Sequence, residues 1–230
     1  REVAPGSLFC CVRGSHSDGH EFADQAVAAG ATALLVDHRV AADVPQIVVP
    51  DVRAAVGPVA ASFHAHPSDS LTVVGVTGTN GKTTTSHLLG AVLRHAGRRT
   101  EVFGTLSGRF TTPEAPEHEA RLATARDTGV DTVVMEVSSH ALALHRVDGT
   151  RFALAVFTNL GRDHFDFHGT EERYFAAKAR LFTPALTAAA VVNLDDVHGR
   201  LLADAASVPT TGYAASEVED LRVTATEHSY

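Results

Sequence analysis

Residues 71–85, LTVVGVTGTNGKTTT, carry the pattern that decides the fold. The apolar run at the start predicts a strand, the glycines after it predict a loop, and the hydroxyl residues that follow Lys82 predict the first turn of a helix. In such a loop, backbone N–H groups surround phosphate, lysine neutralises its charge, and the hydroxyl of Thr83 reaches Mg²⁺. The usual spacing requires glycine where this sequence has Val76, so the loop is a variant. The stretch predicts binding of a nucleoside triphosphate, with a chance turn as the weaker alternative.

The composition of the 230 residues is that of a globular protein, with 44% hydrophobic and 20% charged residues. The formal net charge of −8 argues against nucleic acid or an acidic membrane surface as a partner. No run approaches the ~18 consecutive apolar residues of a membrane span, and we recognise no signal-peptide pattern. Adjacent Cys10 and Cys11 would face opposite sides of a strand, so we expect no disulfide between them. We expect a monomer of the cytoplasm that binds no nucleic acid and does not insert into a membrane.

The pattern along the chain predicts two α/β domains. In the first part, strands are expected at 8–12, 33–36 and 46–49, helices at 21–29 and 51–64, and a polar break at 66–70. We therefore expect a small N-terminal α/β domain at 1–68 and a larger domain at 69–230. Because Arg1 and the last residues resemble the interior of domains, we also expect the chain to be a fragment of a longer protein.

The second part alternates strands with helices. Strands are expected at 71–76, 132–136, 154–157 and 190–194, a strand or loop near 100–103, and helices at 83–95, 114–128, 171–182 and after 196. Continuous apolar strands that alternate with helices predict a mostly parallel sheet covered on both faces. Ligand sites in such sheets lie at the carboxyl ends of the strands, so polar clusters at those ends are the candidate site residues.

Two such clusters follow expected strands. Glu136 ends one strand close to the expected position of the phosphate loop, where a carboxylate suits Mg²⁺; the alternative is a cap for the next helix. The segment 157–170, FTNLGRDHFDFHGT, is densely polar. Its His164 is a candidate metal ligand that Asp163 could orient, although a single histidine more often lies at the surface or is hydrogen-bonded in a core.

Lys178 lies in the helical segment YFAAKARLF, where it shares a partly apolar face with Tyr174. Burial on that face would lower the pKa of the amine and free it for chemistry. The alternative is a lysine whose stem covers apolar surface while its charge stays in water.

Thr111 and Thr112 precede a proline and a glutamate. Two hydroxyl residues before proline are a common helix start. Their alternative use is to bind the carboxylate or phosphate of a second ligand.

Together these strings resemble the Mur ligase family, the ATP-dependent amide-forming ligases of peptidoglycan assembly. The resemblance rests on TGTNGKTT with Val76 before it, and then on TTPE, MEVSSHAL, FTNLGRDHFDFHGT and YFAAKARLF, in that order. The opening VAPGSLFCCVRGSHSDGHEF resembles the UDP-binding first domain of the family, so the whole chain is covered. The combination is most similar to the members that add the third residue of the peptide.

The resemblance implies roles for the residues that match its motifs. Catalytic roles are implied for Lys82, Glu136, His164 and Lys178, with Lys178 carbamylated by CO₂. Mg²⁺ would be held by Thr83, Glu136, His164 and the Lys178 carbamate. ATP would be bound by Gly78, Thr79, Asn80, Gly81, Lys82, Thr83, Thr84, Asn159, Asn193 and Asp195. The other substrate would be bound by Ser15, His16, Ser17, Thr111, Thr112, Ser138 and Arg146.

The resemblance also implies the reaction. ATP would phosphorylate the free carboxylate of UDP-N-acetylmuramoyl-L-alanyl-D-glutamate, and the amine of a diamino acid would attack the resulting acyl phosphate. Mg²⁺ and Lys82 would offset charge on the transferred phosphoryl group. The N-terminal domain would bind the UDP-sugar and the larger, incomplete P-loop domain would bind ATP.

The sequence departs from the family in two respects. Leu144 stands where some members have a substrate-contacting glutamine, and the third domain, which selects the amino acid, is not found. We therefore leave open whether the added amino acid is meso-diaminopimelate, L-lysine or another amine, and we expect these residues alone to form no amide.

Two alternatives to this assignment differ in class. One is another ligase of the same fold, of the D-Ala-D-Ala-adding, folylpolyglutamate or cyanophycin type, against which the TTPE and VSSHAL strings speak. The other is a nucleotide-binding module that has lost catalysis. Retention of Glu136, His164 and Lys178 together argues against that loss.

Overall fold

The computed structural model describes residues 3–14, 17–107 and 110–215. Their strands form two separate sheets, and every strand pairing in both sheets is parallel. The prediction of an α/β fold with mostly parallel sheets is therefore confirmed.

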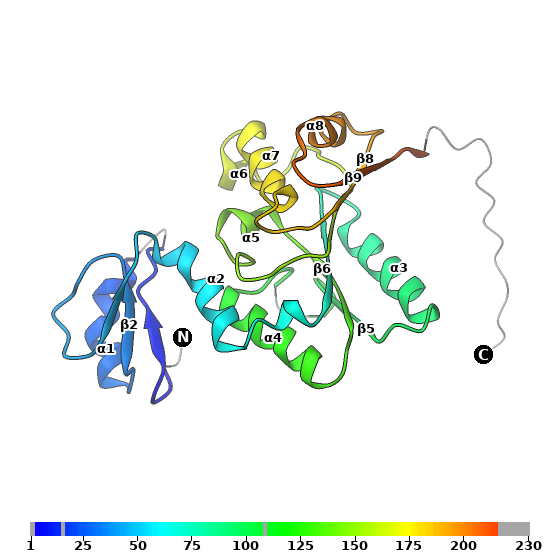
Figure 1. The fold of residues 1–230 in the computed structure, drawn as a ribbon. Helices are drawn as coiled ribbons and strands as arrows, with labels where there is room; N and C mark the ends of the chain where they lie inside the picture. Colours follow the sequence, from blue (N-terminus) through cyan, green and yellow to red (C-terminus); the bar gives the residue numbers. More distant parts are fainter. Residues whose placement is uncertain (1–2, 15–16, 108–109, 216–230) are drawn as a thin grey trace.

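The first sheet is small and has the order β1-β2-β3, built from β1 (Leu8–Cys10), β2 (Ala33–Val36) and β3 (Gln46–Val48). Between β1 and β2 lie the 3₁₀ helix η1 (Gly19–Phe22) and α1 (Ala23–Ala28). Cys11 is buried, Cys10 is partly buried, and the two form no disulfide, as expected. This sheet and α1 lie at one end of the molecule (Figure 1).

Helix α2 (Val52–Phe63) connects this sheet to the rest of the molecule (Figure 1). The Asp51 side chain accepts a hydrogen bond from the Ala54 N–H at 3.1 Å, so Asp51 is the N-cap of this helix. One apolar cluster joins Leu35 of β2, Val56 of α2 and Ala115 of α4 (Ala115–Asp127). The predicted boundary at 66–70 coincides with the 3₁₀ helix η2 (Pro67–Asp69), which follows α2.

The second sheet has six strands in the order β5-β6-β4-β7-β8-β9. They are β4 (Thr72–Thr77), β5 (Thr100–Phe103), β6 (Thr132–Glu136), β7 (Leu154–Phe157), β8 (Ala190–Asn193) and β9 (Thr210–Tyr213). The order places β4, the strand before the phosphate loop, between β6 and β7. Glu136 and the 157–170 segment, which follow those two neighbours, are therefore carried to the same edge of the sheet as the loop.

Alternate residues of these strands pack on opposite faces of the sheet. Val74 and Val134 lie in one apolar cluster with Leu89 of α3 (Lys82–His95), whereas Val73 and Val133 lie in the other. The second cluster is completed by residues of α4, of α5 (Ser139–Ala143), of the 3₁₀ helix η3 (Arg180–Phe182) and of α8 (Val197–Ala205). Both faces are thus covered, as predicted.

Three elements have no counterpart in the sequence-based prediction: α5, α6 (Phe165–His168) and β9. The helix expected at 171–182 is α7 (Glu171–Ala179) continued by η3. The helix expected at 21–29 begins as η1 and continues as α1. In the described part of the chain, no helix is long and apolar enough to cross a membrane.

Candidate active site at the phosphate loop

The loop between β4 and α3 is held in shape by two glycines. Gly78 has φ of 151°, and a Cβ added there would lie 1.9 Å from Thr158 Oγ1. Gly81, with φ of 83°, is the N-cap residue of α3. Both values of φ lie where a side chain is strained, so glycine is required at these positions. The sequence predicted this strand, loop and helix correctly; the helix begins one residue earlier than expected.

Lys82 folds back onto the loop rather than toward solvent. Its Nζ donates hydrogen bonds to the carbonyls of Gly78 at 2.9 Å and Thr79 at 2.8 Å. Burial lowers the pKa of Lys82, and the negative charges of Glu136 and Asp163 act in the opposite direction. The amine therefore lies within the loop, the position at which loops of this kind bind phosphate.

Glu136 is buried, at 1% exposure, and its carboxylate joins the loop to a neighbouring strand. Its Oε2 accepts a hydrogen bond from Thr83 Oγ1 at 2.9 Å, and its Oε1 accepts one from the Thr105 N–H at 2.9 Å. The alternative that Glu136 caps the next helix is wrong, because Ser138 is the N-cap of α5 and accepts from the Ala141 N–H. Two of the four expected Mg²⁺ ligands, Thr83 and Glu136, are thus hydrogen-bonded to each other; that they bind Mg²⁺ stays a prediction.

Gly104 makes room for the Glu136 carboxylate, and neither it nor Thr105 was predicted as a site residue. A Cβ at Gly104 would lie 2.1 Å from Glu136 Oε1. Thr112, buried at 1% exposure, donates from its hydroxyl to the Glu136 carbonyl at 2.9 Å. Thr112 therefore supports the end of β6, while the hydroxyls of Thr105 and Thr111 lie 3.1 Å apart.

Lys178 is buried, at 1% exposure, on helix α7. Its Nζ donates to the Gly78 carbonyl at 2.8 Å and lies 4.5 Å from the centre of the Tyr174 ring. Burial, followed by the nearby charge of Lys82, lowers the pKa of Lys178 from 10.5 to about 7. The alternative of a lysine with its charge in water is therefore wrong. A substantial share of neutral amine near pH 7 is available for reaction with CO₂.

Tyr174 connects α7 to the phosphate loop. Its hydroxyl lies 3.0 Å from Thr79 Oγ1, which also accepts from the Gly161 N–H at 2.8 Å and donates to the Gly161 carbonyl at 3.3 Å. Thr79 is thus engaged by its neighbours through its side chain. From the sequence, Tyr174 was expected only as a helix neighbour of Lys178.

The segment 157–170, which follows β7, also contacts the phosphate loop. Asn159 accepts from the Asn80 N–H at 3.0 Å and donates to the Asn80 carbonyl at 3.2 Å. His164 has φ of 54° and stands at the N-cap position of α6. Its Nε2 lies 3.4 Å from Asp163 Oδ2, so Asp163 is in place to orient the ring as predicted. The ring of His140 lies against it, with centroids 4.8 Å apart.

Two predicted ATP-binding residues, Asn193 and Asp195, lie at the end of β8 and just after it. Asn193 donates to the Thr158 carbonyl at 2.8 Å and accepts from the Asp195 N–H at 2.9 Å. The Asp195 carboxylate accepts from the Ala215 N–H at 2.7 Å. Asn193 therefore acts on the loop through Thr158, which in turn donates to the Asn80 carbonyl at 2.7 Å. Thr84 and Asn80 are exposed on the loop side.

A cavity of about 940 Å³ lies between the small sheet and the larger part of the molecule. From the predicted set, Ser17 and Arg146 line it, and so does Leu144. Arg146 forms an ion pair with Glu114 at 2.7 Å and donates to the Thr112 carbonyl at 3.1 Å. Ser15 and His16 lie outside the described residues. Residues of the wall that the sequence did not indicate include Gln25, Arg53 and His145.

The parallel sheet and its glycine-bearing loop define a nucleotide-binding protein of the P-loop class. The profile of the Mur ligase middle domain matches residues 76–229, and that of the Mur ligase family catalytic domain matches residues 1–64. The chain therefore belongs to the Mur ligase family. The assignment to this family from the sequence motifs is confirmed.

Known members of the family show how much of a ligase this chain represents. The chain is 44% identical over 229 residues to the UDP-N-acetylmuramoyl-L-alanyl-D-glutamate--2,6-diaminopimelate ligase of Streptomyces coelicolor; the match covers 94% of the chain and 45% of that relative. A solved structure of a ligase of that name superimposes with a TM-score of 0.81 at 29% identity, covering 95% of this chain and 48% of that one. The MurF ligase from Thermotoga maritima in complex with ADP gives 0.63 at 27% identity, covering 93% and 48%. The chain thus spans less than half the length of these proteins.

Proposed function

We propose that this chain forms the ATP-binding and UDP-sugar-binding parts of a ligase that joins 2,6-diaminopimelate to UDP-N-acetylmuramoyl-L-alanyl-D-glutamate. The relative in Streptomyces coelicolor carries the name of that activity, and the likeness in fold is higher to a solved ligase of the same name than to the MurF ligase. The observation that carries the proposal is the meeting of Lys82 and Lys178 at the Gly78 carbonyl.

In this proposal the phosphate loop binds ATP, as the ADP complex of a relative with the same fold supports. The backbone of residues 78–83 surrounds the phosphates, and Lys82 neutralises their charge. Thr83, Glu136 and His164 would hold Mg²⁺. When bound, Mg²⁺ offsets the charge that accumulates on the transferred phosphoryl group.

Lys178 is the residue that we propose to be carbamylated. Its neutral amine forms a bond to the carbon of CO₂ and loses a proton, which turns a cation into an anion. The low pKa of the buried amine favours this step near neutral pH. The carbamate would offer an oxygen ligand to Mg²⁺.

The cavity between the two sheets is the proposed site of the UDP-sugar dipeptide. Arg146 is held at its wall by Glu114 and offers a cation to a substrate carboxylate. The free carboxylate attacks the γ-phosphorus of ATP and ADP leaves. The amine of the diamino acid then attacks the acyl carbon, loses a proton, and phosphate leaves.

A binding experiment tests the proposal on the 230 residues themselves. Calorimetric titration with a non-hydrolysable ATP analogue and Mg²⁺ should show one site, which Lys82→Ala weakens at least tenfold. Titration with UDP-N-acetylmuramoyl-L-alanyl-D-glutamate should show a separate site, weakened by Arg146→Ala and unchanged by Lys82→Ala. Absence of ATP-analogue binding in the folded chain would contradict the proposal.

Intact-mass measurement under bicarbonate tests the modification. We expect a mass increase of one CO₂ in the unaltered chain and none in Lys178→Arg, whose guanidinium stays protonated. The monomeric state, the cytoplasmic location and the inactivity of these residues alone stay predictions. Amide formation by the 230-residue chain would contradict the last of them.

A further inference from the structure

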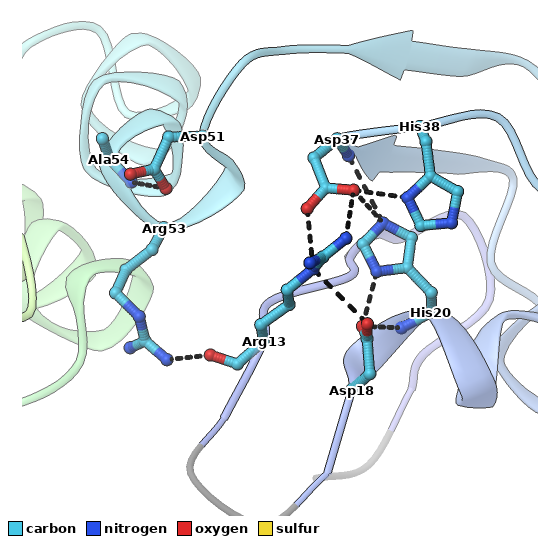
Figure 2. Close-up of polar contacts among 8 residues, drawn as sticks. All are labelled: Arg13, Asp18, His20, Asp37, His38, Asp51, Arg53 and Ala54. Carbon is cyan, nitrogen blue, oxygen red and sulfur yellow. Dashed lines mark hydrogen bonds and ion pairs between the residues drawn. The ribbon is translucent and has the colours of Figure 1, made fainter.

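A cluster of histidine and aspartate side chains lies in the small sheet, away from the phosphate loop. Asp37 and His38 directly follow β2, His20 lies in η1, and Asp18 is the N-cap of η1. In the part of the chain that the structure describes, His20, Asp37 and His38 form the one group of three His, Cys, Asp or Glu residues whose ligand atoms all lie within 4.8 Å of one another (Figure 2). Neither the loop nor the proposed ATP residues belong to it.

The contact with Asp18 decides which ring nitrogen of His20 carries a proton. His20 Nδ1 lies 2.6 Å from Asp18 Oδ1, and a carboxylate accepts hydrogen bonds only, so Nδ1 carries the proton. The other ring nitrogen, Nε2, faces Asp37 (Figure 2). A carboxylate that binds one nitrogen of a histidine and leaves the other free for a metal is the usual arrangement behind metal-ligating histidines.

The contacts of Asp37 favour a cation at this position. His20 Nε2 lies 3.4 Å from Asp37 Oδ1 and accepts a long hydrogen bond, 3.3 Å, from the Asp37 N–H. The one lone pair of the neutral Nε2 is engaged by that N–H, so an ion at Nε2 would take the place of this long hydrogen bond. A separation of 3.4 Å also matches the edge of a tetrahedron around an ion with bonds of about 2.0–2.1 Å.

The third side chain, His38, is exposed enough to adjust and complete the set. Its Nδ1 lies 2.5 Å from Asp37 Oδ1, and its side chain is 55% exposed. Two ligands of one tetrahedral ion are about 3.3 Å apart, so His38 Nδ1 must move about 0.8 Å farther from Asp37 Oδ1. The ring stacks on His20 with centroids 4.3 Å apart, and its exposure leaves room for this rotation.

Arg13 sets the direction of the Asp37 carboxylate. Its Nε lies 2.9 Å from Asp37 Oδ2 and 3.4 Å from Asp18 Oδ2, and its Nη2 donates to Asp37 Oδ1 at 3.2 Å. Each carboxylate oxygen has about two lone-pair sites. On Oδ1 Arg13 takes one, and the other, which His38 Nδ1 now contacts, becomes available to an ion when the His38 ring turns. With both histidines neutral, the two aspartates and Arg13 sum to one negative charge, which favours a divalent cation over no ion at all.

We propose that His20, Asp37 and His38 form a binding site for a divalent transition-metal ion of the zinc class, with water in the fourth position. Two imidazole nitrogens and one carboxylate select zinc-like ions over Mg²⁺, which prefers an all-oxygen shell. The ion links the end of β2 to η1, next to Ser17 and Gly19 in the cavity wall. The site goes beyond the proposed ligase function and does not depend on it.

Zinc titration of the metal-free 230-residue chain, without ATP, tests the site. We expect one Zn²⁺ to bind and both His38→Ala and Asp37→Asn to weaken it at least about tenfold. His87→Ala, at an exposed histidine of α3, is the matched control and should leave the affinity unchanged. Far-ultraviolet circular dichroism checks that each variant is folded. Because His38 is exposed, His38→Ala is the variant least expected to disturb the fold.

Two further measurements distinguish zinc binding at this site from zinc binding at the cysteine thiols or at other histidines. Asp18→Asn should keep one bound ion and weaken it by about 10- to 100-fold, because it removes only the group that orients His20. Co²⁺ should give the absorption of a nitrogen- and oxygen-ligated tetrahedral ion. Equal zinc affinity in the unaltered chain, His38→Ala and Asp37→Asn would overturn the proposal, as would a thiolate band that assigns the ion to Cys10 or Cys11.

Discussion

At the scale of the residue, the Gly78 carbonyl is the point where the chemistry of this site converges. It accepts from both lysines of the proposed machinery, so each ammonium group is close to the other. Burial and mutual repulsion together favour the neutral form of Lys178. The same carbonyl belongs to the loop that is proposed to meet the phosphates.

The depressed pKa of Lys178 predicts a pH-dependent effect on stability. The pKa of the group is about 7 in the folded chain against the ordinary 10.5 of an exposed lysine, so the unfolded chain binds more protons between these limits. The free energy of unfolding contributed by Lys178 therefore rises with pH from about 7 to 10.5. Lys178→Met, which removes the buried charge, should gain stability over the unaltered chain by at least about 1 kcal/mol at pH 7, and this gap should shrink at about pH 9.5.

Urea unfolding of both chains in CO₂-free buffer measures this gap. The carbamate is excluded under these conditions, so the amine alone decides the result. An equal difference in the free energy of unfolding at both pH values would contradict a lowered pKa of Lys178.

Gly104 gives a second prediction at this scale. Alanine at this position would place its Cβ 2.1 Å from Glu136 Oε1, so the carboxylate must leave Thr83 or Thr105. We expect Gly104→Ala to weaken binding of an ATP analogue with Mg²⁺ at least about tenfold, which corresponds to about 1.4 kcal/mol. Calorimetric titration measures it.

Gly161→Ala is the matched control for that substitution. Its Cβ would meet only Thr79 carbons at 3.7 and 3.9 Å, which is ordinary contact. Its nucleotide affinity should stay within a factor of about three of the unaltered chain, in keeping with small surface effects. A similar loss in both variants would mean that any added carbon near the loop is harmful, and that Glu136 has no special place.

At the scale of the element, helix α4 carries a buried polar network that the strand-end rule did not indicate. His118 and Glu119 are fully buried, and both bind the Thr150 hydroxyl, at 2.7 and 2.8 Å. Burial lowers the pKa of His118 to about 4 and raises the pKa of Glu119 to about 7. The helix therefore packs with both groups uncharged at mildly acidic pH.

The raised pKa of Glu119 predicts the effect of removing its charge. Because the folded pKa, about 7, lies above the ordinary glutamate pKa of 4.5, its contribution is present below 4.5 and is lost as the pH rises through about 7. Glu119→Gln keeps an acceptor for Thr150 and cannot ionise. We expect the variant to be more stable than the unaltered chain at about pH 8, by on the order of 1–3 kcal/mol, and equal to it at about pH 4.

Urea unfolding at the two pH values checks this, with Glu117→Gln on the exposed face of the same helix as the control. The control should change stability by less than about 0.5 kcal/mol at either pH. His118 titrates with the opposite sign between about 4 and 6.5 in both chains, so it cancels in the comparison. A stability gain at the lower pH equal to that at the higher pH would contradict the raised pKa.

The elements that the sequence predicted share a long apolar or amphipathic pattern. Strands β4, β6 and β7 and helix α3 were located within one or two residues for that reason. Helices α5 and α6 have five and four residues, too few for a helical period to appear. Strand β9, with the sequence TTGY and three exposed residues, has no apolar run and takes its structure from pairing with β8.

The candidate site shows the same division. Residues on motifs, such as Lys82, Glu136 and Lys178, were predicted from their positions after strands or on a helix face. Gly104 and Thr105 were missed because their role depends on β5 lying beside β6, a pairing that no local pattern reveals. The cluster of His20, Asp37 and His38 was missed for the same reason, since it joins residues from η1 and the end of β2.

At the scale of the whole molecule, the two sheets are joined through a close contact of backbones. A Cβ at Gly57 of α2 would lie 2.9 Å from the Gly149 nitrogen, and a Cβ at Gly149 would lie 2.3 Å from the Gly57 carbonyl oxygen. Helix α2 connects the small sheet to the rest of the molecule and packs on α4 (Figure 1). We therefore expect this contact to set the distance between the walls of the cavity. Neither glycine requires positive φ, so the requirement is one of space.

Gly149→Ala therefore predicts a change in one ligand site only. We expect α2 to be pushed away from the larger sheet and the affinity for the UDP-sugar dipeptide to fall at least about tenfold, or about 1.4 kcal/mol. ATP-analogue affinity should stay the same, because the phosphate loop does not contact this joint. Parallel calorimetric titrations measure both, and an equal loss of the two affinities would show general unfolding instead.

The glycine contact between α2 and residue 149 also constrains how descendants of this chain can change. A larger residue on either side separates the sheets, and no compensating reduction is available, because both partners already lack a side chain. Substitutions in the cavity wall meet no such limit. We expect lineages to diversify their substrates by exchanging wall residues such as Leu144 while inheriting the angle between the sheets unaltered.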